Sequence, residues 1–465
     1  MLSLKQITML VVSITLFMDV MDGNVLNTAV PTMANSFQVN PVDLKVALIS
    51  YLLSIAIFTP ASGWVADYFG AKKIYIGGLI IFVLSSFFCG FATNVPSIVI
   101  GRFIQGIGAA FMIALGRLML ARVFPRNELI ETMSKVVMII SVAVMLGPAV
   151  GGVIVQHWSW PWIFWINVPI GIALITLSII FLKDNTEHVK HPFDTIGFIL
   201  FSGGLSLLCF SLSEMSESRA DIGLAIFNFT IAFLLLIAYV YYAKKIAFPI
   251  IQIALFQKRT FWISVFGNTF ARLGFGGIPF LLPLMQQVCF GFSPQLSGFL
   301  LMPIAIGIIC AKSFATSFLR KLGYRRYLLI NTVIISFLLC LFALTTAQTH
   351  LWVIALLTFL LGVFLSAQFT GMNSLAFADI EDHQLSASTS ITTTTQIIGQ
   401  SLGVAVGALL LRFFSALDTH HFTLTVHLFH QTFVVLSVIT LMSSIVFIRL
   451  HKQDGTVMLT RGHIH

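Results

Sequence analysis

Residues 7–31 read ITMLVVSITLFMDVMDGNVLNTAVP, and this stretch decides the class of protein. It exceeds the roughly 20 mainly apolar residues that an α-helix needs to cross a bilayer. A cleaved signal peptide is not indicated, because the stretch is too long, contains Asp19 and Asp22, and lacks a small-residue cleavage site. We therefore predict a first transmembrane helix that carries two acidic residues.

The rest of the chain repeats this pattern. Hydrophobic residues make up 58% of the sequence and charged residues 9%, whereas a soluble domain carries about 25% charge. No gap between apolar stretches is long enough for a separate soluble domain, so we expect an all-α integral membrane protein. The fourteen candidate spans are residues 7–31, 43–66, 74–93, 95–121, 129–155, 162–182, 194–213, 223–243, 261–286, 295–316, 327–346, 350–376, 386–412 and 428–449.

The Lys and Arg residues predict the orientation. They are concentrated in every second loop between the predicted spans. Lys5 and Arg449 lie near the two ends of the chain, so both termini are expected on the same side of the membrane as these basic loops. Such an excess marks cytoplasmic loops, so both termini are predicted to be cytoplasmic in a bacterial inner membrane. The net charge of +9 is spread over short clusters between spans, without a long basic run, and nucleic acid is not expected as a partner.

Enzyme chemistry is not indicated. The five cysteines have no metal-ligand spacing, and the chain has no nucleotide-binding loop and no nucleophile constellation. His420, His421, His427 and His430 cluster in sequence but match no strong metal template. We expect no catalytic residue, no metal and no cofactor.

Two acidic residues lie well inside a span, and they are Asp19 and Asp22. Three residues apart, they share one helix face. Asp22 lies about 13 Å and Arg102 of the fourth span about 10 Å from the outer helix ends, so an ion pair forms if the two helices touch. A charge in the bilayer centre costs at least about 2.5–3.5 kcal/mol, which favours a role in proton transfer; a static pair that orients two helices is the alternative.

Three further basic residues lie inside spans. Arg272 is too central to reach the membrane surface, so we expect it to face a substrate cavity. Arg117 and Lys135 lie near cytoplasmic ends, where long side chains extend to the surface.

Glycine, proline and amide residues mark certain spans. The fifth span carries Gly147-Pro148-Ala149-Val150-Gly151-Gly152, typical of a pliable and closely packed helix, although ordinary close packing explains it as well. The fourth span combines Arg102 and Gln105 with Gly106 and Gly108. The thirteenth carries a similar mixture, namely Gln396, Gly399, Gln400 and Gly403.

A weak internal repeat connects the two halves of the chain. Residues 67–73 read DYFGAKK and residues 320–326 read RKLGYRR, and both are basic, Gly-centred connections between two spans. Such repeats are typical of transporters built from two related halves.

Four of these segments together resemble the major facilitator superfamily. Within it they are similar to the fourteen-span drug:proton antiporters of the EmrB/QacA type, and most similar to the MdtD-like exporters. The resemblance covers nearly the whole chain. Its motifs are residues 63–73 (GWVADYFGAKK), Arg102 to Gly108, Gly147-Pro148 with Gly151-Gly152, and Asp22 with residues 27–31 (NTAVP).

The resemblance implies two six-helix bundles, residues 1–183 and 259–465, joined by two extra transmembrane helices within residues 184–258. It implies alternating access to a central cavity, and a fifth span that marks exporters. The implied roles are proton coupling for Asp22, Asp19 and Arg102; substrate-cavity lining for Arg272, Gln105, Asn27 and Gln396; a conformational latch of Gly63, Asp67, Gly70, Lys72 and Lys73; and an antiporter motif of Gly147, Pro148, Gly151 and Gly152.

Two positions depart from the family pattern. Tyr68 stands where a basic residue is usual, which weakens the charge network of the latch. Asp19 is an additional acid, and the two Asp residues against Arg102 and Arg272 leave the charge of the substrate open.

The predicted function is proton-coupled export of small amphiphilic compounds, that is, multidrug efflux. An exporter dedicated to one endogenous metabolite, such as a siderophore or an organic acid, is the alternative. A membrane-embedded enzyme, a receptor or a channel is disfavoured, since no polar catalytic cluster or filter-like segment is found. We expect a monomer whose partners are a small-molecule substrate, protons and the lipid bilayer, with periplasmic and outer-membrane components left open.

Overall fold

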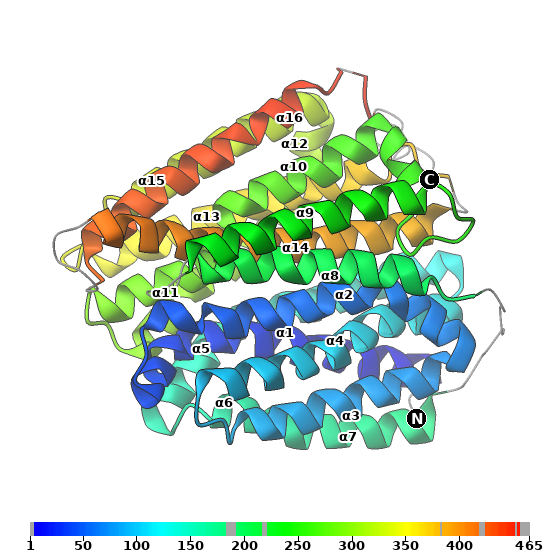
Figure 1. The fold of residues 1–465 in the computed structure, drawn as a ribbon, viewed down its shortest axis with the longest axis horizontal. Coiled ribbons are helices and arrows are strands. Elements are labelled where there is room, and N and C mark those ends of the chain that lie inside the picture. Colours follow the sequence, from blue (N-terminus) through cyan, green and yellow to red (C-terminus); the bar gives the residue numbers. More distant parts are fainter. Residues whose placement is uncertain are drawn as a thin grey trace. The chain divides into compact units, whose positions relative to one another are not determined.

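The computed structural model describes residues 4–182, 192–215, 221–381, 384–417, 424–451 and 453–455, and within them every regular element is a helix (Figure 1). The chain forms two compact units. Unit 1 comprises Met1–Thr195 with Phe292–Met302, and unit 2 comprises Ile196–Gly291 with Pro303–His465. The predicted boundary at residue 183 lies outside the described residues.

Unit 1 contains the helices between residues 4 and 181. Apolar runs of this length become helices in a membrane because a helix satisfies all backbone hydrogen bonds within the segment. The elements are α1 (Leu4–Phe37), η1 (Pro41–Leu44), α2 (Lys45–Phe69), α3 (Ala71–Cys89), α4 (Val95–Val123), α5 (Arg126–His157), α6 (Trp162–Trp165) and α7 (Asn167–Phe181). Unit 1 also holds the beginning of α12 (Pro294–Phe342).

Unit 2 contains the remaining helices, and α8 begins at the unit boundary. They are α8 (Thr195–Glu214), α9 (Ile222–Ala243), η2 (Ile253–Gln257), α10 (Arg259–Phe275), α11 (Ile278–Val288), the rest of α12, α13 (Leu351–Ala376), α14 (Leu385–Leu417), α15 (Val426–Met442) and α16 (Ser444–Ile448).

The two Gly-centred connections of the internal repeat adopt a similar backbone. Gly70 separates α2 from α3 with φ 101°, and Gly323 interrupts α12 with φ 71°. Positive φ is accessible to glycine without steric cost, so each glycine permits a turn that other residues resist. The repeat seen in the sequence is therefore also a repeat of local structure.

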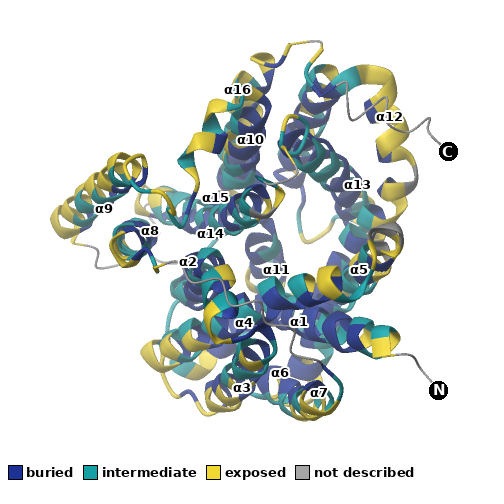
Figure 2. Ribbon diagram, turned by 90° about the vertical axis from the view of Figure 1, so that its right-hand side faces the viewer, coloured by how far each residue is buried: buried dark blue, intermediate teal, exposed yellow. Residues whose placement is uncertain are grey.

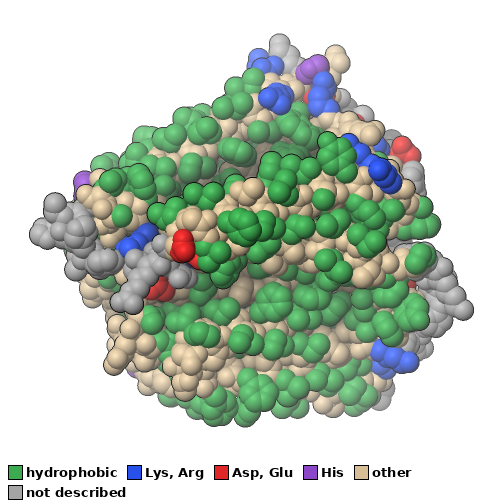
Figure 3. Space-filling view, in the orientation of Figure 1, with side chains coloured by type: hydrophobic (Ala, Val, Ile, Leu, Met, Phe, Trp, Pro, Cys, Tyr) green, Lys and Arg blue, Asp and Glu red, His purple; other side chains and the backbone are tan. Residues whose placement is uncertain are grey.

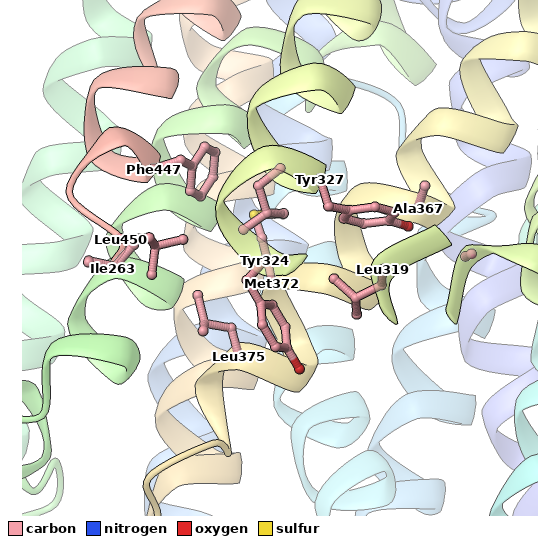
Figure 4. Packing of buried hydrophobic residues seen from close by; sticks show 11 residues of the cluster. Ile263, Leu319, Tyr324, Tyr327, Ala367, Met372, Leu375, Phe447 and Leu450 are labelled. Carbon is pink, nitrogen blue, oxygen red and sulfur yellow. The ribbon is translucent and has the colours of Figure 1, made fainter. Parts of the chain in front are cut away.

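A cluster of buried hydrophobic side chains joins several helices of unit 2. Tyr324 and Tyr327 of α12 pack with Ile263 of α10, Met372 of α13 and Phe447 of α16 (Figure 4). Burying a large apolar side chain stabilises the fold by about 1.5–3 kcal/mol in a soluble protein, where water is the alternative. In a membrane, close contact between side chains provides the stabilisation instead.

Thirteen helical segments of the described residues are long and apolar enough to cross a membrane, and they correspond to thirteen of the fourteen predicted spans. The remaining one, residues 261–286, is divided between α10 and α11 at Gly276 and Gly277. These glycines let the break pack against α14, because a methyl group on Gly277 would lie 2.7 Å from the carbonyl oxygen of Gly403.

The outer helix faces are apolar. Helix α9 is largely exposed along its length (Figure 2), and its exposed side chains include Phe227, Phe233, Leu234 and Tyr241. Hydrophobic side chains cover most of the surface drawn in Figure 3, while its charged side chains lie near helix ends. A surface of this kind requires lipid as its surroundings.

Candidate functional site

A buried ion pair connects two helices of unit 1. Nη1 of Arg102 in α4 donates a hydrogen bond to Oδ2 of Asp22, near the middle of α1. The two side chains are 0% and 1% exposed. The sequence predicted this ion pair on the condition that the two helices touch, and the structure brings them together.

Three neutral side chains complete the surroundings of the pair. Nδ2 of Asn167 and Nε2 of Gln105 donate to Oδ1 of Asp22 over 2.7 and 3.1 Å. Gln105 also accepts a 2.7 Å hydrogen bond from Arg102, and both amides donate to the hydroxyl of Ser86. Asp22 is thus held by a cation and two amide donors, and Gln105, which was predicted to line the substrate cavity, is fully buried in this network.

Asp19 has different surroundings, although it lies one helix turn away. Its carboxylate accepts a hydrogen bond from the hydroxyl of Tyr51 in α2. It forms no ion pair within the described part of the chain, and its residue is 7% exposed. The guanidinium of Arg102 lies 4.0 Å from the centre of the Tyr51 ring, so the same tyrosine contacts the acid through its hydroxyl and the cation through its ring.

Sequence reasoning missed Tyr51, Ser86 and Asn167. Each is a polar residue within or next to an apolar span, but serine, asparagine and tyrosine are common there and carry no charge that would single them out. Only contact with Asp19, Asp22 or Gln105 distinguishes them.

Unit 2 contains a second polar group around Arg272 of α10. Its Nε donates to Oδ1 of Asn268 over 2.9 Å and its Nη1 donates to Oε1 of Gln400 over 3.2 Å. The guanidinium also lies 4.3 Å from the centre of the Phe369 ring. Gln396, also predicted for the cavity, donates instead to Asn373 over 2.7 Å.

The predicted latch residues lie at the adjoining ends of α2 and α3. Asp67 pairs with Arg122 at the end of α4 over 3.4 Å, a partner that sequence reasoning did not assign to it. Lys72 donates to the carbonyl of Ile179 over 2.9 Å. Lys73 and Gly63 are exposed, and Gly70 provides the turn described above.

Tyr68 does not carry charge in this segment, but it contributes to an aromatic group. Its ring stacks on Trp64 at 5.0 Å between centroids, and Trp64 also contacts Phe193 at 4.8 Å.

The glycines of the fifth-span motif are contact points of α5. A methyl group on Gly147 would lie 2.7 Å from Cβ of Asn24, and one on Gly151 would lie 2.7 Å from the carbonyl oxygen of Val25. A methyl group on Gly152 would lie 2.3 Å from the carbonyl oxygen of Pro294. The motif therefore packs α5 directly on α1 and on the beginning of α12.

Pro148 follows Gly147 in α5, and Asn27 lies two residues after Val25 in α1. The carbonyl oxygen of Pro148 faces Gly298 of α12, since a methyl group on Gly298 would lie 2.2 Å from it. Asn27 is buried in α1.

The remaining charged and histidine residues are less informative. Lys135 pairs with the exposed Glu131 over 2.7 Å, and Arg117 is exposed, in keeping with the expectation that these two side chains reach the surface. His420 and His421 lie outside the described residues, and His427 contacts Gln431 over 3.0 Å.

Comparison with known proteins identifies the family. A family model described as Major Facilitator Superfamily matches residues 12–404 and residues 264–457. The chain is 34% identical over 406 residues to "Putative multidrug resistance protein MdtD" of Pectobacterium carotovorum subsp. carotovorum (strain PC1), covering 87% of each chain. It is 33% identical over 450 residues to "Probable transport protein HsrA" of Haemophilus influenzae, covering 96% of each.

Solved structures show the same fold. A D-xylose-proton symporter superposes with a TM-score of 0.70 at 13% identity, covering 97% of this chain and 99% of that one. A bacterial homolog of the human lysosomal transporter Spinster superposes with a TM-score of 0.68 at 13% identity, covering 96% and 97%. At this identity the likeness concerns the fold alone, and it confirms the predicted fold class. With the family model matching most of its length, this chain is a multi-pass membrane protein that belongs to the Major Facilitator Superfamily of transporters.

Proposed function

We propose that this chain is a proton-coupled secondary transporter that exports small amphiphilic compounds by alternating access. The name of the MdtD relatives supports multidrug resistance as the biological role. The glycine-rich contact of α5 supports export, since it matches the antiporter motif of the family.

The contrast between Asp19 and Asp22 carries the proposal. A proton added to Asp22 would break its ion pair and leave Arg102 buried without a counter-charge, which costs about 3–5 kcal/mol. A proton added to Asp19 breaks no ion pair, because its partner is the neutral hydroxyl of Tyr51. We therefore assign proton uptake and release to Asp19, and the coupling of α1 to α4 to Asp22 and Arg102.

The other motifs receive roles from their positions. The close contacts of Gly147 and Gly151 leave α1 and α5 no intervening side chains, so a movement of one helix is transmitted to the other. The partly exposed Asp67–Arg122 pair lies at helix ends, where it can be made and broken between two conformations.

The proposed location is a bacterial inner membrane with both termini in the cytoplasm. The alternation of Lys- and Arg-rich connections supports this orientation. The proposed protein is a monomer whose partners are protons and a small-molecule substrate. Periplasmic components are proposed as additional partners in the cell.

Substrate-dependent proton movement in proteoliposomes tests the proposal. The purified protein is reconstituted with a pH-sensitive dye inside the vesicles, and a panel of cationic, neutral and anionic amphiphiles is added. Wild type is compared with Asp19→Asn and Asp22→Asn. Glu131→Gln is the matched control, because it removes the carboxylate of an exposed pair at a helix end.

We expect several compounds to move protons through the wild type and the Glu131→Gln variant, and none through Asp19→Asn. Asp22→Asn should also lose proton movement, because it releases Arg102 from its counter-charge. Wild-type proton movement in Asp19→Asn would refute its assignment as the proton site. No proton movement with any compound in the wild type would refute drug:proton antiport.

An exporter dedicated to one endogenous metabolite is the second candidate. The observation that favours it is Arg272, a basic residue inside a membrane-spanning region with only amide hydrogen-bond partners. Such a group favours an anionic substrate, as an organic-acid metabolite would be. A response of the vesicles to a single compound of the panel would support this candidate over broad efflux.

A further inference from the structure

Arg272 lies in the last turn of α10, near the middle of the region that α10 and α11 form together, and it has no counter-charge among the described residues. It stands 13 residues after Arg259, at which α10 begins, which corresponds to about 20 Å along the helix axis. A charged side chain at such a depth costs at least about 2.5–3.5 kcal/mol unless a partner or water compensates it. Among the described residues Arg272 forms no ion pair.

The sequence makes a carboxylate partner from the surrounding helices impossible. Residues 222–378 contain no Asp and no Glu, and neither does the stretch 384–417 that includes α14. Arg102, by contrast, has Asp22 of the neighbouring helix. Rearrangement of α10 to α14 among themselves therefore cannot neutralise Arg272.

Two hydrogen-bond donors of this group remain unused. Oδ1 of Asn268 accepts from Nε of Arg272, which orients the amide so that Nδ2 is its free donor. That Nδ2 is buried without a partner in the described structure, on a residue that is 1% exposed. Nη2 of Arg272 likewise makes no hydrogen bond to a described residue. A buried donor without an acceptor costs about 1–3 kcal/mol.

The neighbouring residues fix the position of the guanidinium. The Phe369 ring covers it at 4.3 Å. Nε2 of Gln400 donates to the carbonyl of Gly276 over 2.9 Å, which holds the amide that accepts from Arg272. A methyl group on Gly399 would lie 3.1 Å from Cβ of Arg272, so the arginine stem packs closely on α14. An arginine held in this way is preorganised for a planar anion.

We propose that Arg272, Asn268 and Gln400 bind the carboxylate of an anionic amphiphilic substrate. The inference rests on the proposed transport function and specifies the class of its substrates. The guanidinium and Nδ2 of Asn268 donate to the carboxylate oxygens, since Arg and carboxylate form paired, charge-assisted hydrogen bonds. Gln400 positions Arg272, and Phe369 contributes apolar surface beside the charged end of the substrate.

Binding of a matched pair of compounds tests this proposal. Naphthalene-2-carboxylate and its neutral amide share the same ring system, and their affinities are measured by calorimetry for the full chain in nanodiscs of zwitterionic lipid. No proton gradient is present, so the result does not depend on proton coupling. The variants are Arg272→Gln and Asn268→Asp, and Arg320→Gln is the matched control because Arg320 is exposed on α12.

We expect the wild type and Arg320→Gln to bind the carboxylate at least about tenfold more tightly than the amide, the size of one charge-assisted hydrogen bond. Arg272→Gln should abolish this preference. Asn268→Asp should abolish the preference too, because the new carboxylate would pair with Arg272 and take the place of the ligand. This variant keeps Arg272 and its partner, so it tests the proposal even if Arg272→Gln fails to fold.

Equal affinities of the wild type for the carboxylate and the amide would overturn the proposal, as would a preference that survives in Asn268→Asp. Loss of the preference in nanodiscs that contain phosphatidylglycerol would also overturn it, since a lipid headgroup would then be the ligand. Carboxylate binding without proton movement in vesicles would refute the proposed function and leave the carboxylate site supported. Proton-coupled export without a preference for the carboxylate would refute the carboxylate site and leave the proposed function supported.

Discussion

Asp22 of α1 and Arg102 of α4 form an ion pair whose two side chains are almost completely removed from the surface of unit 1. The pair is 80 residues apart in sequence and depends on contact between two membrane-spanning helices. Its atoms are further bonded to Gln105 and Asn167, so it fixes the relative position of α1, α4 and α7.

Arg102→Gln is expected to destabilise the protein by about 3–5 kcal/mol, because it leaves Asp22 buried without a cation. The apparent melting temperature of the purified protein in detergent measures this loss. The double variant Asp22→Asn with Arg102→Gln removes both charges and should recover most of the stability. If the single and double variants melt together below the wild type, the loss comes from packing and not from an uncompensated charge.

Tyr51→Phe is expected to reduce substrate-dependent proton movement in vesicles, because it removes the hydroxyl that donates to Asp19. A hydrogen bond to a charged group contributes about 1.5–3 kcal/mol, so the decrease should be roughly tenfold or more. The substitution keeps the ring that lies against Arg102 and removes only the hydroxyl. Wild-type proton movement in Tyr51→Phe would therefore show that the hydrogen bond to Asp19 has no role in transport.

Gly147→Leu is expected to stop transport or prevent folding, because any side chain at this position meets Cβ of Asn24 and separates α5 from α1. Overpacking of this kind costs about 1–3 kcal/mol or more. Substrate flux and the yield of monodisperse protein are measured together. Gly77→Leu in α3 is the control, because no atom lies within 4 Å of a methyl group there. Normal flux in Gly147→Leu would contradict a role of this contact in transport.

Asp67→Asn is expected to reduce transport while lowering the free energy of unfolding by no more than about 1 kcal/mol, because a partly exposed ion pair contributes little stability. Exchange of the charges in the double variant Asp67→Arg with Arg122→Asp should restore part of the activity. Lys135→Gln, which breaks another exposed pair over 2.7 Å, should leave transport unchanged. Equal effects of Asp67→Asn and Lys135→Gln would show that the first pair has no specific role.

Much of the candidate site could be predicted because membrane insertion makes charge rare. Asp19, Asp22, Arg102 and Arg272 stand out in the sequence as charged residues within apolar spans, and the structure places all four in hydrogen-bonded groups. Their neutral partners could not be predicted, because polar uncharged residues such as Asn167 and Asn268 occur throughout the spans.

The sequence by itself determined the membrane environment, the helical elements and the residues that carry charge within them, because hydropathy and helix length are local properties of the chain. It also located Gly70 and Gly323, whose turns follow from the special backbone freedom of glycine. Only the tertiary structure decided that Arg102 pairs with Asp22 and not with Asp19, that Asp67 pairs with Arg122, and that Arg272 bonds to Asn268 and Gln400. These outcomes depend on which faces of distant helices meet, and a displacement of α1 by about one helical turn along its axis would bring Asp19 to the place of Asp22.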